Sequence, residues 1–336
     1  MDCKSVKPAF EKDNIAIAFA VDQNYLPYLK YVVKSIVANL KRGNLDILVL
    51  HGGKLDGGEL LAYFSNFQNV SVRFVDASAY FNAVIAPYFV QREYLTIASV
   101  YRLMIPDLLP AYDKMLWLDA DIVVTGDISE LYGEDLADFW LGAVKGFGLG
   151  DHPRKTHEIK RYKTLLQWAK KYNFNPWQKY INSGVLLMNL AALRAADVEK
   201  RLVNIAIDPL SQWPDQDALN VVCRGHIKYL DERWNFQVFT HPVRELPGPG
   251  IVHYIGKIKP WCSPRVQHAD LWWNYFYSDG QNAESMKRIL KVVSDSYEER
   301  LVELNAKCRK IKRSVSYKLG RALTKPFRAI TGAKDL

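Results

Sequence analysis

A short apolar run that ends in two aspartates constrains the fold of this chain more than any other feature. Residues Met115–Leu118 are apolar without polar alternation, and Asp119 and Asp121 follow them directly. Strands of this composition are buried on both faces, as they are in a parallel sheet that helices cover on each side. The run therefore predicts a layered α/β fold in which this strand ends at a charged edge.

The rest of the chain alternates between short apolar runs and segments with helical periodicity. Such alternation is typical of an open sheet with mainly parallel strands and helices between them. The other expected strands are Ile15–Val21, Asp46–Leu50, Val70–Val75 and Gly184–Leu190, and a hydrophobic stretch follows at Ile251–Ile255. The expected helices are Tyr28–Leu40, Leu60–Phe67, Val100–Leu109, Glu158–Tyr172 and Ala191–Ile207.

The two aspartates themselves point to a metal site. Residues i and i+2 of an extended backbone face the same side, so Asp119 and Asp121 can reach one divalent cation. Open α/β sheets bind ligands beyond the carboxyl ends of their strands, and a cation held by two carboxylates keeps positions that a diphosphate can fill. The alternative is a solvated pair in a turn. Burial of two like charges is costly unless a cation compensates them, so their position beside an apolar run favours the metal site over that alternative.

Cysteine usage and hydropathy favour a cytoplasmic protein. The four cysteines are widely spaced and form no CxxC pair, so they predict neither a zinc cluster nor a dense disulfide framework. The charged N-terminus and the apolar run that stops at Asp22 lack the organisation of a signal peptide. No run approaches about 18 consecutive apolar residues, so we expect no transmembrane helix.

The charge excess is concentrated near the C-terminus. The chain has 45 Lys and Arg against 36 Asp and Glu, a formal net charge of +9. Nine of the basic residues and no acidic residue lie within 307–328, so the remainder of the chain is formally neutral. Apolar residues recur there at helical spacing, which predicts a basic amphipathic helix on an anionic membrane surface. A solvated or disordered tail is the alternative, and nucleic-acid binding is disfavoured because an apolar face has no role in it.

Several motifs, taken together in their order, resemble bacterial glycosyltransferases of family 8, of the lipopolysaccharide or lipooligosaccharide galactosyl- or glucosyltransferase type. The resemblance covers roughly residues 14 to 277. The motifs are Ile17–Tyr25, Tyr101–Leu103, Leu118–Asp121, Asn182–Leu190, Asp215–Asn220 and His253–Trp261.

The resemblance implies a Rossmann-like nucleotide-sugar-binding fold of the GT-A type, with a mainly parallel mixed sheet flanked by helices. It implies a retaining, metal-dependent transferase that moves galactose or glucose from UDP-galactose or UDP-glucose to a lipid-linked oligosaccharide acceptor. Asp119, Asp121 and His253 would be the metal ligands. Imidazole beside carboxylates suits Mn²⁺ better than Mg²⁺, although Mg²⁺ stays possible.

The resemblance also assigns the remaining site residues. Gln216 and Asp215 are the catalytic candidates, with Gln216 near the anomeric centre and Asp215 on the sugar hydroxyls. For Asp22 the alternative is a helix cap, for Arg102 a surface position, and for Asp215 and Gln216 an N-cap and first helical turn. The candidate donor and nucleotide contacts are Ala20, Asp22, Asn24, Arg102, Asp119, Ala120, Asn182, Gly184, Gly256 and Lys259.

One departure and one open choice accompany this interpretation. Family members commonly place an aspartate where this chain has Lys145 and Gly146, so a donor-sugar contact is supplied differently or lost. Residues 148–179 are either an acceptor-side lid or a surface helix. We expect a transferase domain at 13–280 and a C-terminal, membrane-associated region at 281–336. This would place the protein at the inner face of the membrane. The second hypothesis is a non-catalytic nucleotide-sugar or carbohydrate-binding protein.

Overall fold

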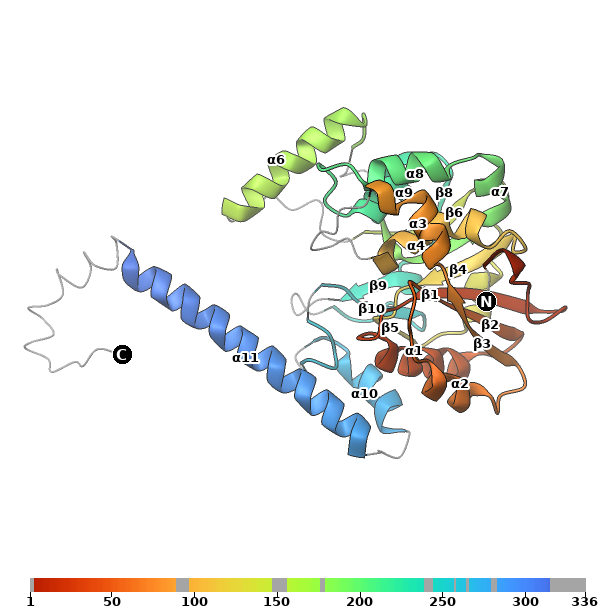
Figure 1. Cartoon of the computed structure of the whole chain (residues 1–336), viewed down its shortest axis with the longest axis horizontal. Coiled ribbons are helices and arrows are strands. Elements are labelled where there is room, and N and C mark those ends of the chain that lie inside the picture. The colour runs from red at the N-terminus through yellow and green to blue at the C-terminus, as the bar shows by residue number, and fades with distance from the viewer. Residues whose placement is uncertain are drawn as a thin grey trace, which may run out of the picture.

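A computed structural model describes residues 3–88, 97–146, 156–175, 179–238, 244–256, 258–263, 266–278 and 283–314. Figure 1 shows a central twisted sheet with helices on both sides, and a long C-terminal helix that leads away from it. The membrane segment expected at 307–328 is described only as far as residue 314. The segments 148–155 and 176–178 of the expected lid also lie outside the described residues.

The larger sheet has seven strands in the order β3-β2-β1-β4-β7-β6-β8. Neighbouring strands are parallel except where β7 pairs with β4 and with β6. The predicted α/β class with a mainly parallel mixed sheet is therefore confirmed. The strands are β1 (Asn14–Ala20), β2 (Asn44–His51), β3 (Val70–Asp76), β4 (Lys114–Leu118), β6 (Leu141–Lys145), β7 (Ile181–Asn189) and β8 (Ile227–Tyr229).

A second sheet of three short strands packs beside the first. It has the order β5-β10-β9, with β10 antiparallel to β5 and parallel to β9. Periodicity did not predict this sheet, because strands of three or four residues are too short to show a repeat. Its strands are β5 (Ile122–Val124), β9 (Phe236–Val238) and β10 (Ile251–Tyr254).

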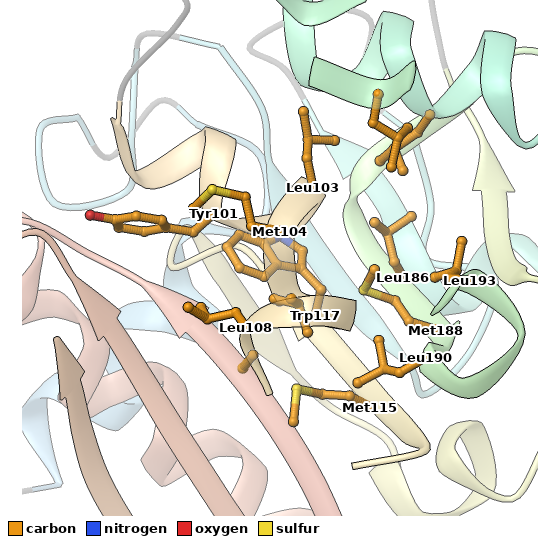
Figure 2. Close-up of a cluster of buried hydrophobic side chains, with 14 of the residues drawn as sticks. Tyr101, Leu103, Met104, Leu108, Met115, Trp117, Leu186, Met188, Leu190 and Leu193 are labelled. Carbon is orange, nitrogen blue, oxygen red and sulfur yellow. The ribbon is translucent and has the colours of Figure 1, made fainter. Parts of the chain in front are cut away.

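Helices cover both faces of the large sheet because alternate residues of its strands point to opposite sides. Ala16 and Ala18 face the cluster formed with α4, α7, α8 and α9, whereas Ile17 and Phe19 face α1, α2 and α5. Figure 2 shows the first cluster, in which Trp117 and Met115 of β4 pack against α4 and β7. The helices are α1 (Leu26–Asn39), α2 (Gly58–Phe64), α3 (Ser78–Val84), α4 (Ile97–Leu108), α5 (Ile128–Tyr132), α6 (Thr156–Lys171), α7 (Leu190–Ala195), α8 (Glu199–Ala206), α9 (Pro214–Val222), α10 (Ala269–Tyr277) and α11 (Ala283–Arg313), with 3₁₀ turns η1 (Cys3–Ser5), η2 (Ala86–Tyr88) and η3 (Glu232–Asn235).

The prediction of a single helix at Ala191–Ile207 is wrong. The segment forms α7 and α8, and the chain between them turns at Asp197, which has a φ of 46°. A left-handed residue cannot continue a right-handed helix, and Asp is one of the few residues that tolerate this conformation. The apolar positions on either side still pack into one cluster, which is why their spacing looks continuous in the sequence.

Helix α11 begins against the body of the protein and then becomes exposed. Ile289 in its first turns is buried among aromatic side chains of α1 and α10, whereas Leu301, Leu304 and Ile311 are about half or more exposed. Figure 1 shows the helix projecting beyond the sheets. Across the described ranges, no helix combines the length and the hydrophobicity that a membrane-spanning segment needs.

A buried aspartate lies at the edge of the large sheet where β2 begins. Asp46 is fully buried and pairs with Arg73 of β3. Its second oxygen accepts hydrogen bonds from the Tyr112 hydroxyl and from the backbone N–H of Ala9, both at 2.9 Å. The N-terminal segment and the turn before β4 are thus tied to one carboxylate.

We predict that Asp46→Ala destabilises the protein by about 3–5 kcal/mol, because it leaves the partly buried Arg73 guanidinium and the buried Tyr112 hydroxyl without their shared partner. The measurement is urea unfolding followed by far-UV circular dichroism. Asp113→Ala is the matched control: it breaks the ion pair with Arg194, but the Asp113 side chain is 82% exposed. Its cost should stay below about 1 kcal/mol, and equal losses in the two variants would contradict the argument.

Candidate functional site

Polar residues from three strands meet at one edge of the large sheet. Asp119 and Asp121 follow the carboxyl end of β4, and β7 begins beside them because it runs antiparallel to β4. The backbone N–H of Asp119 donates to the carbonyl of Gly184 at 2.8 Å, which fixes the two segments to each other. Strand β10 adds His253 through the small sheet. The fold therefore brings together three segments that are far apart in the sequence.

A cleft of about 430 Å³ opens beside these residues, which is within the usual size of a small-molecule site. Five of the predicted donor contacts line it together with Tyr25 of the β1–α1 turn and Trp117 of β4. The lining residues are Ala20, Val21, Asp22, Tyr25, Ala98, Ser99, Arg102, Trp117, Asp119, Ala120 and Asp121.

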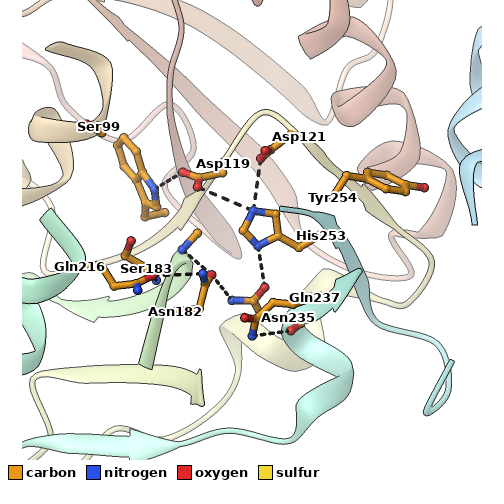
Figure 3. Close-up of polar contacts among 12 residues, drawn as sticks. Ser99, Asp119, Asp121, Asn182, Ser183, Gln216, Asn235, Gln237, His253 and Tyr254 are labelled. Atoms are coloured by element: carbon orange, nitrogen blue, oxygen red, sulfur yellow. Dashed lines mark hydrogen bonds and ion pairs between the residues drawn. The ribbon is translucent and has the colours of Figure 1, made fainter. Parts of the chain in front are cut away.

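The three predicted metal ligands form one cluster. One ligand atom each from Asp119, Asp121 and His253 lies within 4.8 Å of the others. His253 Nε2 is 3.3 Å from Asp121 Oδ1 and 3.8 Å from Asp119 Oδ2 (Figure 3). Two carboxylates and an imidazole form a donor set that suits Mn²⁺ and related divalent cations. The residues present therefore fit a metal site.

Gly184 makes room for this cluster. A Cβ at this position would lie 2.1 Å from His253 Cε1 and 2.9 Å from Asp119 Oδ2. Any larger residue would displace the imidazole or the carboxylate. Gly184 was predicted as a donor contact, and the structure places it under the metal ligands instead of on the cleft wall.

Two cations hold the aspartates in place. Arg102 of α4 donates to Asp119 Oδ1 at 2.8 Å, lies 3.2 Å from Asp215 Oδ2, and packs over the Trp117 ring. The alternative of a surface arginine is wrong, because Arg102 is only 5% exposed. Lys259 pairs with Asp121 and donates to the carbonyl of Tyr254 at 2.7 Å.

The pKa values of two carboxyl groups in this site are shifted in opposite directions. Burial alone would raise the pKa of Asp121, but the nearby Lys259 ammonium and His253 outweigh it and lower that pKa. Burial raises the pKa of Asp215, and Arg102 offsets this only in part. Asp121 is thus held as a carboxylate, the form that binds a cation.

The β1–α1 turn presents Asp22 and Asn24, which were predicted to contact the nucleotide. Asp22 Oδ1 accepts hydrogen bonds from the backbone N–H groups of Asn24 at 3.0 Å and Tyr25 at 2.9 Å. Asp22 and Asn24 nevertheless stay exposed, and Asp22 lines the cleft. The helix-stabilising interpretation of Asp22 and a ligand contact are therefore compatible. Gly256, a further predicted contact, follows β10 with a φ of 89°, a conformation that favours glycine.

The catalytic candidates lie in the first turn of α9. Gln216 Oε1 accepts from Asn182 Nδ2 at 3.1 Å and from the backbone N–H of Ser183 at 3.0 Å, and Asp215 accepts from the Ser183 hydroxyl at 3.0 Å. The first-turn interpretation of Asp215 and Gln216 is confirmed, but neither is the N-cap, which is Trp213. Instead, Asp217 Oδ2 accepts hydrogen bonds from the backbone N–H groups of Gln212 and Trp213.

Sequence reasoning missed Asn235 and the role of Tyr25 as a wall of the cleft. Asn235 is fully buried and bonds both His253 and Asn182. Its only signal in the sequence is a polar residue between Trp234 and Phe236, and nothing there names its partners. Tyr25 stood within the first motif but was not singled out.

Comparison with known proteins is consistent with this geometry. The model of the family described as Glycosyl transferase family 8 matches residues 16–264. General stress protein A of Bacillus subtilis (strain 168) is 27% identical over 281 residues, which are 75% of this chain and 89% of that relative. Lipopolysaccharide 1,2-glucosyltransferase of Escherichia coli (strain K12) is 26% identical over 271 residues, 73% of this chain and 72% of that relative.

Solved structures support the predicted fold. The galactosyltransferase LgtC, in a complex with donor and acceptor sugar analogues, superposes with a TM-score of 0.63 at 23% identity. The match covers 82% of this chain and 100% of LgtC. The likeness confirms the predicted GT-A-type architecture.

We predict that Gly184→Ala weakens binding of Mn²⁺ by about 10–100-fold, the range seen when the support of metal ligands is disturbed. The reason is the collision of the new Cβ with His253 and Asp119. Mn²⁺ titration monitored by electron paramagnetic resonance measures the effect. Gly146→Ala is the control, since its Cβ would meet neighbours only at 3.5 Å. Unchanged Mn²⁺ affinity in Gly184→Ala would show that the cluster is not the metal site.

Proposed function

Because the chain belongs to glycosyl transferase family 8 and is a glycosyltransferase, we propose that it is a retaining, metal-dependent hexosyltransferase. It would move galactose or glucose from a UDP-sugar to a lipid-anchored lipopolysaccharide or lipooligosaccharide core. The observation that carries the proposal is the convergence of Asp119, Asp121 and His253 beside a cleft of suitable size.

The metal site has a defined role in this reaction. Asp119, Asp121 and His253 would hold Mn²⁺ or Mg²⁺, which supplies positive charge to the diphosphate as UDP leaves. Lys259 offers an ammonium on the same side as Asp121. Gly256, with its positive φ, leaves the backbone beside it open to a bulky anion.

The cleft walls suit a nucleoside. Tyr25 offers an aromatic face, and the exposed Asp22 and Asn24 offer acceptors and donors for base and ribose. Ala20 and Ala120 are small residues that let a ligand approach the strand ends. Arg102 lies between Asp119 and Asp215, where its charge stabilises groups at the sugar end of the cleft.

Retention of configuration follows most simply from substitution on one face of the sugar. The bond between the anomeric carbon and the UDP oxygen breaks with its electron pair on UDP, and the acceptor hydroxyl oxygen bonds to the same face. The acceptor proton passes to the departing phosphate oxygen. Gln216 carries an amide, a weak nucleophile, so a covalent intermediate is disfavoured. Asp215 would hold hydroxyl groups of the donor sugar.

Two observations favour a lipid-anchored acceptor. A relative that matches most of this chain is named as a lipopolysaccharide glucosyltransferase. The basic stretch 307–328 begins within the exposed C-terminal part of α11, and such stretches gain about 1 kcal/mol per basic residue near an anionic surface. The enzyme would then lie on the inner face of the membrane, where its acceptor is presented.

The primary test is UDP release across a panel of nucleotide sugars. We expect release with UDP-galactose or UDP-glucose only when Mn²⁺ or Mg²⁺ is added. We also expect Asp119→Asn and Asp121→Asn each to lower the rate by about 10²-fold or more, because a charged ligand is lost. Asp138→Asn, an exposed aspartate between α5 and β6, is the control and should retain the rate.

Two outcomes would overturn the proposal. Near-normal turnover in both aspartate variants would remove the metal role. Binding of UDP-sugars without any turnover, in the presence of metal and candidate acceptors, would favour the second hypothesis of a non-catalytic carbohydrate-binding protein.

We further predict that truncation after Ala306 abolishes co-sedimentation with anionic vesicles and preserves release of UDP from the donor. The truncation removes all nine basic residues of 307–328 and leaves the described site intact. Vesicles of neutral lipid are the control and should not sediment the full chain. Undiminished sedimentation of the truncated chain with anionic vesicles would exclude the tail as the membrane contact.

A further inference from the structure

We propose that Asn235 is a positioning residue, which sets the orientation of His253 and, through Asn182, that of Gln216. The proposal rests on the proposed function, because it assumes that His253 binds the metal and that Gln216 faces the donor sugar. Nothing in the comparisons assigns a role to Asn235.

Asn235 lies at the centre of the site without touching the cleft. It ends the 3₁₀ turn η3, just before β9, and is fully buried. Its Oδ1 is 2.8 Å from His253 Nδ1, and its Nδ2 donates to Asn182 Oδ1 at 2.8 Å. Figure 3 shows the resulting chain of hydrogen bonds from His253 through Asn235 and Asn182 to Gln216, which we call the relay.

Two backbone N–H groups of β7 determine which way each amide points. The N–H of Ser183 can only donate, so the Gln216 atom that it meets at 3.0 Å is the amide oxygen. The N–H of Gly184 likewise meets Asn182 Oδ1 at 3.0 Å. Asn182 must then turn its NH₂ group toward Gln216 Oε1, as is observed at 3.1 Å.

The same logic extends to the histidine. Because Asn182 presents oxygen to Asn235, Asn235 presents its NH₂ group in return and turns its own oxygen toward His253. An oxygen there selects the imidazole tautomer with hydrogen on Nδ1. The lone pair then lies on Nε2, which faces Asp119 and Asp121. Second contacts of this kind orient metal-binding histidines and raise their basicity.

The relay also determines what Gln216 can do. Its Oε1 already accepts two hydrogen bonds, from Asn182 and from Ser183, and a carbonyl oxygen has two lone pairs. The amide oxygen is therefore not available to attack the anomeric carbon. This agrees with substitution on one face of the sugar.

Conservative variants divide the relay at defined links. Asn235→Asp keeps an oxygen for His253 Nδ1–H but loses the NH₂ group that Asn182 needs. Asn235→Ala loses both links. Asn182→Asp keeps the acceptor for Gly184 and Asn235 but loses the donor to Gln216. A residue with only a structural role would not distinguish these variants.

The first measurement is the tautomer of His253, from two-dimensional ¹⁵N–¹H spectra of the metal-free full chain, assigned with His253→Ala. The wild type and Asn235→Asp should show the Nδ1–H form. Asn235→Ala should show a mixture or the Nε2–H form. Finding the Nε2–H form in the wild type, or an unchanged tautomer in Asn235→Ala, would overturn the proposal.

The second measurement compares Mn²⁺ affinity with kcat. Asn235→Ala should lose about 10–100-fold in Mn²⁺ affinity. Asn235→Asp and Asn182→Asp should keep Mn²⁺ affinity within about threefold and lose about 10-fold or more in kcat. Asn39→Asp, which alters a partly buried amide between α1 and β5, is the control and should change neither.

The outcomes separate the two levels of the argument. If the wild type binds no Mn²⁺ and transfers sugar without it, the proposed function fails. If the wild type binds Mn²⁺ and folded Asn235→Ala binds Mn²⁺ with the same affinity, only the positioning role fails. Should Asn235→Ala not fold, a kcat of Asn235→Asp and Asn182→Asp equal to that of the wild type would be equally decisive against the relay.

Discussion

The repulsion between two carboxylates at the end of β4 is the constraint around which this site is organised. Asp119 is compensated by Arg102 from α4, and Asp121 by Lys259 from the segment after β10, with His253 between them. Each compensating group comes from a different element, so the site exists only when the two sheets and α4 are assembled. The same guanidinium and ammonium are the groups that an anionic donor would meet. We infer that donor binding exchanges partners among charges already present instead of bringing new charges into a buried place.

Strand direction explains why these residues are neighbours. The carboxyl ends of β1 and β4 lie at one edge of the sheet, where ligands of open α/β folds bind. Because β7 is antiparallel to β4, its first residues lie at that same edge. Asn182 and Gly184 therefore reach the metal ligands from the beginning of a strand. Had β7 been parallel, its first residues would lie at the opposite edge, where Asp46 is located.

The sequence predicted five strands of the large sheet, which are long enough to show their apolar pattern, but not β6 or the three-residue β8. It predicted Asp119 and Asp121 because their spacing within an apolar run is itself informative. It failed at Asp197, where one left-handed residue interrupts an otherwise continuous helical pattern. It could not predict the burial of Arg102, since helical periodicity does not say what covers a polar residue. Asn235 was out of reach for another reason: its partners are 18 and 53 residues away, and only the assembled fold brings them together. The other site residues came from the family resemblance, not from periodicity.

The relay through Asn235 makes the backbone of β7 the reference for both halves of the site. An amide side chain can be turned by half a rotation with little change in shape, so its orientation is decided only by its partners. Here the decision traces back to the N–H groups of Ser183 and Gly184, which belong to a strand with paired neighbours on both sides. The lone pair of His253 and the engaged oxygen of Gln216 therefore follow from one piece of backbone. A displacement of β7 would disturb His253 and Gln216 together, so under the proposed function it would couple cation binding to the chemistry of transfer.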